Sequence, residues 1–369
     1  MLASDWNCDR RMKNDAGCNE WGKNILIMMM RMILLDREYP QASLIISNFN
    51  GKNFLRECLS SLFRQDYPGS YEVIVVDAGS TDGSPKMVEE EFPEVKLIRA
   101  SRIGIGKALN SGLRLAQGEI LAFDINNDER FSTSWLRILV DALLRLPNAG
   151  VVGGLRILHG TKDVVDEAGI VFNKLGIPSS YTRLKLSDIP EKPRKVDYVG
   201  TPLFHKRILN LVGVCDEDYV LYSEDEDFCA RVKKAGYDVL LVPQAIAYHR
   251  RSATIGKASS LSAYYQRRNH IRFIIKNFPV SRMFLALFWY VFLLTAIEAL
   301  MFVPIFKRLF SLQGSRLVFL SQKHTKENFR ATIEAIRWNI QNFRSTISLR
   351  YQIFRQSKSK RALWTMSLE

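Results

Sequence analysis

The stretch YEVIVVDAGSTDGSP, residues 71–85, contains the basic unit of the fold. Tyr71 to Val76 is an apolar run rich in β-branched residues, as in a strand buried on both faces. Asp77 to Gly83 is an acidic, glycine-containing turn, and Ser84-Pro85 is typical of the first residues of a helix. The stretch therefore predicts a strand, a turn and a helix in succession.

The same unit repeats on both sides of this stretch. Strands that alternate with helices at this spacing form parallel sheets covered on both faces. The sequence therefore predicts an α/β, Rossmann-like fold with a mostly parallel sheet flanked by helices. Residues 155–200, with three prolines, are expected to form loops and short strands. The predicted strands are 42–47, 71–76, 95–99, 119–123, 151–152 and 239–242, and further predicted helices are 53–65, 104–116, 134–146 and one from Ser223.

Ligands of such sheets bind beyond the carboxyl ends of the strands. The loops after Ser47, Val76 and Phe123 are therefore expected to face one site. In the first turn, the carboxylates of Asp77 and Asp82 can accept hydrogen bonds from a nucleobase or from ribose hydroxyls. The alternative is that Asp, Gly, Ser and Thr in this stretch only make a turn.

Asn126-Asn127-Asp128 follows the strand that ends at Phe123. One carboxylate with neighbouring amide oxygens and diphosphate oxygens suits a hard divalent cation such as Mg²⁺ or Mn²⁺. Taken alone, these residues more often form a turn. His249, after the last strand, is either a metal ligand or a satisfied surface histidine. Asp124 adds a nearby acid to which the sequence assigns no role.

Four acids, Glu224 to Asp227, begin a predicted helix. Ser223 and Glu226 form a capping-box pattern, and Gly236 marks the end of the helix. Acids at a helix start complement the helix dipole. A carboxylate on such a rigid element is also well placed to act as a general base.

The composition permits a globular enzyme and indicates an attraction to polyanions. The 369 residues include 52 Lys+Arg against 38 Asp+Glu, which gives a net charge of +14. Nucleic acid, anionic lipid and phosphorylated substrates all fit this charge. The sequence carries no recognisable nucleic-acid recognition motif, so nucleic acid is not an expected partner. The five cysteines are scattered and predict a reduced compartment.

The two ends of the chain differ from the middle. Residues 1–40 are expected to be an extension of doubtful structure. Their apolar run 25–35 is too short to span a bilayer, and charged residues follow where a signal peptide would be cleaved. Residues 41–279 are expected to form the α/β catalytic domain.

Residues 280–369 are expected to form a hydrophobic and basic helical region that associates with a membrane. The apolar segment 283–306 is long enough to span a bilayer, but the strongly basic segment 307–361 follows it. An in-plane or re-entrant element is therefore favoured over a simple span. A buried helix hairpin is the third alternative. Residues 329–351 are predicted to form one or two further basic amphipathic helices.

About two thirds of the chain, from residue 42 to about 278, closely resembles the family 2 inverting glycosyltransferases of the GT-A fold. The resemblance is closest to the rhamnosyltransferase-like members. The matching pieces occur in order along the chain and are SNFNG (47–51), YP (67–68), 75–83, 104–112 with Asn110, Asn126-Asn127-Asp128, Gly200, YSEDED (222–227), Arg231, AGY (235–237), VP (242–243), YH (248–249) and 265–269.

The resemblance implies roles for individual residues. Asp225 would be the catalytic base. Asp128 would be the metal-binding end of the family's Asp-x-Asp motif, whose first position is Asn126 here, which leaves one fewer anionic ligand. His249 would lie near the metal and the diphosphate. The nucleotide-sugar side would comprise Ser47, Phe49, Asp77, Asp82, Asn110 and Asn126, and the acceptor or diphosphate side Gly200, Glu224, Arg231 and Arg268.

The resemblance also implies a function. The expected reaction transfers a sugar with inversion from a UDP-, GDP- or dTDP-sugar to a lipid-linked saccharide or other glycan acceptor, in cell-surface polysaccharide or glycoconjugate synthesis. Mg²⁺ or Mn²⁺ is the expected cofactor. The expected location is the cytoplasmic face of the cell membrane. The alternatives are a polyprenyl-phosphate sugar synthase and a catalytically silent nucleotide-binding scaffold on the same fold.

Overall fold

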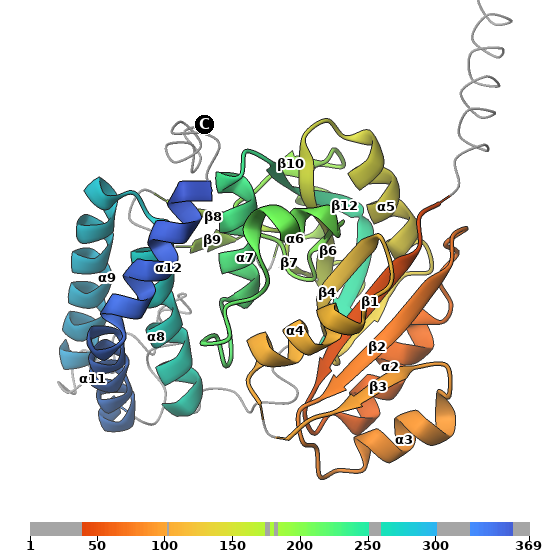
Figure 1. Cartoon of the computed structure of the whole chain (residues 1–369), viewed down its shortest axis with the longest axis horizontal. Coiled ribbons are helices and arrows are strands. Elements are labelled where there is room, and N and C mark those ends of the chain that lie inside the picture. The colour runs from red at the N-terminus through yellow and green to blue at the C-terminus, as the bar shows by residue number, and fades with distance from the viewer. Residues whose placement is uncertain are drawn as a thin grey trace, which may run out of the picture. The chain divides into compact units, whose positions relative to one another are not determined.

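The structure is a computed structural model that describes residues 39–101, 103–173, 178–180, 184–250, 260–300 and 325–356. The chain divides into a unit of residues 1–40 and a unit of residues 41–369. The expected N-terminal extension, apart from its last two residues, lies outside the described part. So do residues 301–306 of the expected hydrophobic segment and much of the basic segment after it. The elements described below belong to the second unit (Figure 1).

Four parallel strands form one half of the main sheet. Their order is β4-β1-β2-β3, and each runs in the same direction as its neighbour. In this register Asn48 lies opposite Asp77, and Ser47 lies opposite Asn126. The carboxyl ends of three strands therefore meet at one edge, as the sequence predicted. The strands are β1 (Ala42–Asn48), β2 (Tyr71–Asp77), β3 (Lys96–Arg99) and β4 (Ile120–Asn126).

The other half of the sheet is mixed. β11 runs antiparallel between β4 and β6, and β6 pairs in parallel with β12. Three short strands, β5, β7 and β10, add antiparallel pairs. The α/β class is confirmed, but the sheet is mixed where the sequence predicted mostly parallel strands. The bounds are β5 (Glu129–Phe131), β6 (Ala149–Leu158), β7 (Val165–Glu167), β10 (Arg194–Lys195), β11 (Leu203–His205) and β12 (Asp238–His249).

The segment between β6 and β11 is irregular, as its prolines predicted. Besides β7 and β10 it holds a separate two-stranded sheet of β8 (Ile170–Phe172) and β9 (Pro178–Ser180). A short 3-10 helix, η1 (Leu186–Asp188), follows. This segment brings acidic residues of β7 to the edge of the main sheet beside β6.

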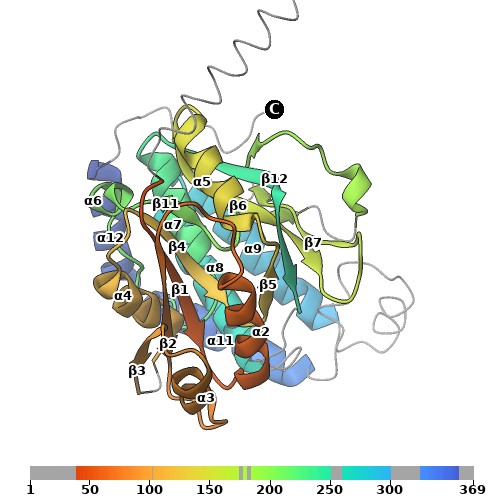
Figure 2. The same cartoon turned by 90° about the vertical axis from the view of Figure 1, so that its right-hand side faces the viewer.

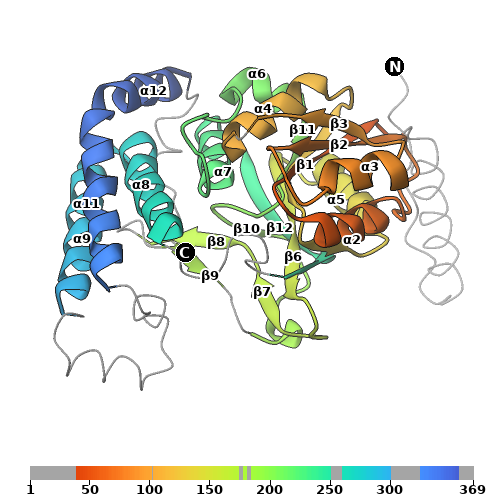
Figure 3. The ribbon, with the colours of Figure 1, turned by 90° about the horizontal axis from the view of Figure 1, so that it is seen from below.

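Helices cover both faces of the main sheet, as Figures 2 and 3 show. Successive residues of a strand point to opposite faces of the sheet, and Leu44, Ile45 and Ile46 of β1 are all buried. Both faces of the sheet are therefore covered. Ile45 belongs to the core cluster shared with α4 and α7. The helices are α2 (Lys52–Leu62), α3 (Ser84–Glu91), α4 (Ile105–Leu115), α5 (Trp135–Arg145), α6 (Arg207–Val212) and α7 (Glu224–Lys234).

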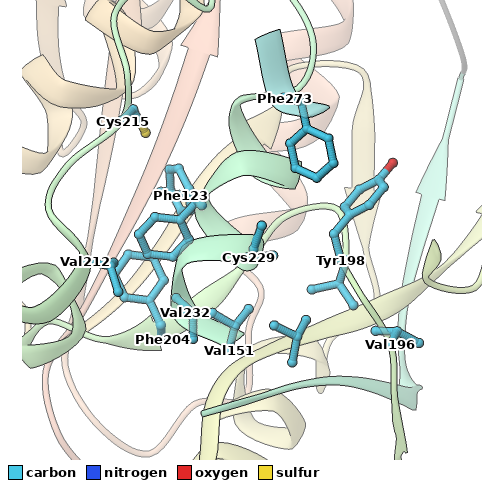
Figure 4. Close-up of a cluster of buried hydrophobic side chains, with 14 of the residues drawn as sticks. Phe123, Val151, Val196, Tyr198, Phe204, Val212, Cys215, Cys229, Val232 and Phe273 are labelled. Atoms are coloured by element: carbon cyan, nitrogen blue, oxygen red, sulfur yellow. The ribbon is translucent and has the colours of Figure 1, made fainter. Parts of the chain in front are cut away.

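An aromatic cluster fixes α7 on the sheet. The rings of Phe123, Phe204 and Phe228 come from β4, β11 and α7, with centroids 4.6 to 5.4 Å apart. Figure 4 shows the first two of these beside Cys229 and Val232 of α7. Removing one such buried ring typically costs about 3–5 kcal/mol. The helix that carries the predicted catalytic base therefore has a firmly determined position.

Helix α7 begins where the sequence predicted, but its cap differs. Ser223 is the N-cap residue, with a left-handed φ of 70°, and its side chain makes no capping hydrogen bond. The predicted capping box is therefore absent. Gly236 follows the C-cap with a φ of 92°, as expected for the glycine after a helix.

A layer of four helices follows the sheet domain. α8 (Ser260–Asn277) contacts α7, α9 (Val280–Leu300), α11 (Thr325–Gln341) and α12 (Phe343–Gln356). Figures 1 and 3 show α9 and α11 farther from the strands than α8. One or two helices were predicted over 329–351, and two are observed, with wider bounds. Among the described helices, none combines the length and the apolar character needed to cross a bilayer.

Buried ion pairs join α8 to α7. Lys276 Nζ lies 2.7 Å from Asp216 and 2.9 Å from the carboxylate of Asp227 on α7. Arg272 Nη2 lies 3.0 Å from Asp216, and Asn277 Nδ2 donates to Asp227 Oδ1 at 2.9 Å. These contacts attach the four-helix layer to the helix that carries Asp225.

Candidate active site

Asp77, at the end of β2, is held by the turn that follows it. Its Oδ1 accepts the backbone N–H groups of Gly79 at 3.1 Å and Ser80 at 2.8 Å. Its Oδ2 accepts a hydrogen bond from Asn48 Nδ2 at 2.8 Å. The carboxylate is therefore fixed at the edge of the sheet, although part of its hydrogen-bonding capacity maintains the turn itself.

Asp82 closes the same turn against the start of α2. It accepts the backbone N–H of Lys52 at 2.8 Å and that of Ser84 at 3.0 Å. Although burial opposes the change, these hydrogen bonds and that of the Ser84 hydroxyl lower the pKa of Asp82. Ser47 and Phe49 flank Asn48 at the end of β1. The four residues predicted to hold a nucleoside therefore come together at neighbouring strand ends.

A chain of side-chain amides links this group to the predicted metal residue. Asn127 Nδ2 donates to Asn48 Oδ1 at 2.7 Å, and Asn48 in turn donates to Asp77. Asn126 ends β4, in register with Ser47. Asp128 follows directly in the chain. Hydrogen-bonded contacts thus run across the carboxyl ends of β2, β1 and β4.

Asp128 and His249 form one candidate metal site. β5 and β12 pair so that His249 lies opposite Glu129, and His249 Nε2 lies 3.4 Å from Asp128 Oδ1. His249 Nδ1 lies 2.8 Å from Asp166 Oδ2. Burial alone would lower the pKa of His249, but the two carboxylates raise it to about 9, so a cation would bind Nε2 by displacing the proton that it shares with Asp128.

This geometry fits a divalent cation. Two adjacent ligands of an octahedral cation with bonds of about 2.1 Å lie roughly 3 Å apart, close to the observed separation of Asp128 Oδ1 and His249 Nε2. Asp166 supplies the outer carboxylate that commonly orients a ligating histidine. Asp128 and His249 are therefore the residues that could hold Mg²⁺ or Mn²⁺.

Asp124, Glu224 and Asp225 form a second acidic group. One carboxylate oxygen from each lies within 4.8 Å of the other two. Desolvation raises the pKa of both Asp124 and Glu224 well above the usual range, and the mutual repulsion of the acids adds to the effect. The three oxygens are close enough to share a cation, so this acidic group is a second candidate cation site.

Asp225 differs from its two neighbours. Asp124 and Glu224 are buried, whereas Asp225 is partly exposed. Desolvation and the charge of Glu167 raise the pKa of Asp225 to about 6, and the charge of Arg156 opposes this rise. Asp225 is therefore the acid of this group that can be reached from outside, and with a pKa of about 6 it is mostly ionised at neutral pH.

Arg156, in β6, lies among carboxylates beneath this group. Its Nε is 2.5 Å from Glu129 and its Nη1 is 3.2 Å from Glu167. Its Nη2 donates to Thr201 Oγ1 at 3.0 Å. A Cβ at Gly200 would lie only 1.8 Å from Arg156 Nη1. Gly200, predicted on the acceptor or diphosphate side, therefore makes room for this guanidinium.

Backbone in the left-handed region surrounds the acids. Asp124, Thr201, Tyr222 and Ser223 have φ between 51° and 70°. Such residues are uncommon outside glycine and cluster at functional sites. The two consecutive ones, at 222 and 223, stand directly before the first turn of α7.

Three residues that were predicted to contact the donor or acceptor instead contact other parts of the protein. Asn110 bonds the backbone carbonyl and N–H of Cys215, each at 3.0 Å. Arg231 Nε lies 2.9 Å from Asp227 Oδ2. Arg268 packs its guanidinium over the ring of Trp338, 4.4 Å from the centroid. None of these described contacts brings the three side chains to the acids at the strand ends.

Sequence reasoning missed several residues of the site. Asn48 was detectable, because it ends a predicted strand beside Ser47. Arg156 was also detectable as a charge within an otherwise apolar strand. Asp166 and Glu167 gave no signal, because they lie in the irregular segment and reach the site only through the pairing of β7 with β6.

Part of the chain matches a known protein family. Residues 43–179 match the family model described as glycosyl transferase family 2. This chain contains a glycosyl transferase family 2 domain. The matched range includes the ends of β1, β2 and β4, and stops before α7, which carries Asp225.

Relatives of the glycosyltransferase domain differ in length and in name. The N-acetylglucosaminyl-diphospho-decaprenol L-rhamnosyltransferase of Mycobacterium tuberculosis is 28% identical over 230 residues, which cover 53% of this chain and 72% of the relative. The uncharacterized protein y4gI of Sinorhizobium fredii is 27% identical over 235 residues, 59% of this chain. The matched part spans only 25% of that protein's length.

A solved structure supports the fold of the glycosyltransferase domain. The crystal structure of GalNAc-T7 with UDP, GalNAc and Mn²⁺ aligns with a TM-score of 0.56 at 15% identity, over 83% of this chain and 58% of that one. At this identity the similarity concerns the fold alone.

Proposed function

We propose that this chain transfers a sugar, with inversion, from a nucleotide-sugar donor to a hydroxyl of a glycan or lipid-linked saccharide. The observation that carries the proposal is the position of Asp225. It is partly exposed, has a pKa of about 6, and its carboxylate lies within 4.8 Å of that of Asp124 in β4, the strand that ends just before Asp128.

The proposed mechanism is a single in-line displacement. The carboxylate of Asp225 accepts the proton of the acceptor hydroxyl while that oxygen bonds to the anomeric carbon. The bond from this carbon to the diphosphate oxygen breaks on the opposite face, and the electron pair leaves with the nucleoside diphosphate. A positioned base of this kind contributes on the order of 10²- to 10⁴-fold in rate.

The residues at the strand ends would hold the donor. Asp77, Asp82, Ser47 and Phe49 would bind the nucleoside of a UDP-, GDP- or dTDP-sugar. Asp128 and His249 would hold Mg²⁺ or Mn²⁺, and the bound cation would neutralise charge on the diphosphate. The name of the mycobacterial relative supports a diphosphate-linked lipid acceptor, and we propose action at the cytoplasmic face of a membrane.

The test is a donor screen followed by one substitution. Purified protein is incubated with a panel of nucleotide sugars and Mn²⁺, and released nucleoside diphosphate is measured. For a donor that turns over, Asp225→Asn should lower the rate at least about 100-fold, since it removes the base. Asp163→Asn, on an exposed carboxylate, is the matched control. Equal rates for Asp225→Asn and the unsubstituted protein would contradict the assigned role.

A further inference from the structure

We infer that the outer face of α9 and α11 docks on the surface of an anionic lipid bilayer, with α9 lying in the plane of the interface. This inference goes beyond sugar transfer, because it concerns a surface that carries none of the site residues. It is argued below from exposure, periodicity and charge in these two helices.

The α9 part of this face is apolar and aromatic. Its exposed side chains are Phe284, Leu285, Phe288, Trp289, Phe292 and Leu293, and two of them, Phe284 and Phe288, are 66% and 60% exposed. They recur every four residues in two adjacent rows, so they share one side of the helix. Residues 283–297 include no charged side chain. A soluble monomer rarely exposes so continuous an apolar stripe.

The opposite side of α9 packs on the protein. Met283 and Ala286 are buried, and the ring of Tyr290 lies 4.5 Å from that of His270 on α8. Contacts with α8 and α11 hold the helix in this rotation. The apolar stripe therefore faces outward because the other side of the helix is already occupied.

The α11 part of the face combines cations with apolar residues. Arg330, Ile333, Arg337 and Ile340 are exposed and recur at spacings of three and four, so they form one stripe. The buried side of α11, including Ala335 and Asn339, packs on α8, where Asn339 Nδ2 donates to the backbone carbonyl of Arg268 at 2.9 Å. In both helices the stripe therefore lies opposite the side that packs on α8. Figure 3 shows α9 and α11 beside α8.

Charge decides which occupant fits this face. On α11 the exposed Lys326, Arg330 and Arg337 outnumber Glu327 and Glu334 by one, and Arg330 Nε lies 3.0 Å from Glu334 Oε1. The exposed Arg344 and Arg355 of α12 add two further cations. The whole chain carries +14. Two copies would bring like charges together, whereas anionic headgroups would be attracted to the cations while the aromatic rings enter the interface. An anionic bilayer can therefore contact both the apolar stripe of α9 and the cations of α11.

The test uses the full chain and lipid vesicles, without donor or acceptor. Flotation with vesicles of phosphatidylcholine, with and without phosphatidylglycerol, should show binding to the anionic vesicles that weakens at high salt. Phe288→Ser/Phe292→Ser should weaken binding about tenfold or more. Leu115→Ser/Leu144→Ser changes two exposed leucines of α4 and α5, and should bind like the unsubstituted protein. Arg330→Gln/Arg337→Gln should reduce the preference for anionic lipid.

Three outcomes would overturn the inference. These are a lack of binding to anionic vesicles, equal binding by the Phe288→Ser/Phe292→Ser variant, or a dimer in light scattering that this variant converts to a monomer. The last outcome would assign the face to a second copy of the chain. Because no sugar transfer is measured, none of these results depends on the proposed reaction.

Discussion

Arg156 places one positive charge among the carboxylates beneath the proposed base. Burial and the charge of Glu167 raise the pKa of Asp225 to about 6, and the charge of Arg156 opposes this rise. Because the base must be ionised, we expect kcat/KM to fall as the pH drops through about 6. Arg156→Gln removes the lowering charge, so this acidic limb should move to higher pH, by on the order of one unit.

The control variants separate charge from folding. Arg156→Lys keeps the charge and should retain most of the original profile. Arg156→Gln/Glu167→Gln also removes the opposing carboxylate, so its limb should move back toward that of the unsubstituted protein. Arg137→Gln, in an exposed pair with Asp66, should leave the profile unchanged. A folded Arg156→Gln protein with an unmoved limb would refute the electrostatic role.

A second prediction concerns Asp166 and tests the proposed metal site. It contacts His249 on the ring nitrogen that faces away from Asp128. Outer carboxylates of this kind typically contribute 10- to 100-fold in metal affinity. We therefore expect Asp166→Asn to weaken Mn²⁺ binding by roughly this factor in calorimetry. Asp163→Asn should bind Mn²⁺ normally, and unchanged affinity in the Asp166→Asn protein would argue against the Asp128–His249 site.

At the scale of elements, single substitutions should affect stability most where α7 is attached to α8. Lys276 is buried between Asp216 and Asp227. Removing one partner of a buried ion pair leaves an uncompensated charge and commonly costs about 3–5 kcal/mol. We expect Lys276→Met to lower the free energy of unfolding by roughly 3 kcal/mol in urea titrations. Lys86→Met, in an exposed pair with Glu90, should change it little.

The same attachment has a defined pH dependence. Although burial opposes them, Lys276 and Arg231 hold the pKa of Asp227 well below its usual range. A lowered carboxyl pKa stabilises the fold above the unfolded pKa, near 3.9, and this stability is lost as the pH falls further. The unsubstituted protein should therefore lose stability below about pH 4. The Asp227→Asn protein should already be less stable at neutral pH, and its stability should fall less when the pH is lowered.

Some elements could be predicted from the sequence and others could not, for physical reasons. β1, β2 and β4 could be predicted because their runs are apolar and followed by polar or turn residues, and the four-residue β3 because it falls between two predicted helices. β11 has three residues, too few for periodicity to reveal an antiparallel strand, so the mixed half of the sheet was missed. Asp77, Asp128 and Asp225 were predicted as one site because strand ends and a helix start determine their positions.

The remainder of the site depends on contacts between distant segments. Asp166, Glu167 and Thr201 approach the acids only after β6, β7 and β11 have paired. Asn110 and Arg231 were assigned to donor and acceptor by resemblance, yet their described hydrogen bonds hold the 212–217 loop. A sequence pattern identifies such residues but does not show which side of an element they face.

At the scale of the whole molecule, Trp338 of α11 packs on α8, the helix of the four-helix layer that is attached to α7 of the sheet domain. Its ring lies under the guanidinium groups of Arg268 and Arg272, at 4.4 and 5.4 Å. Trp338→Ala removes both stacking contacts and should lower stability by about 2 kcal/mol, seen as a lower Tm for the whole chain.

Trp289→Ala is the matched control, because Trp289 is on the exposed side of α9. Its Tm should stay close to that of the unsubstituted protein. If Trp338→Ala lowered only a separate early transition, the helical layer and the sheet domain would unfold independently, contrary to this expectation.

The strand order also has a consequence for synthesis on the ribosome. β6 is made early but pairs with β11 and β12, and the last residue of β12 emerges about 90 residues later. At translation rates of about 5–20 residues per second, β6 waits roughly 5 to 20 seconds for its partners. During that interval the backbone groups of β6 that later pair with β11 and β12 are unpaired, and its apolar side chains are uncovered. The half-translated chain should therefore bind chaperones, and overexpression should cause aggregation at this stage.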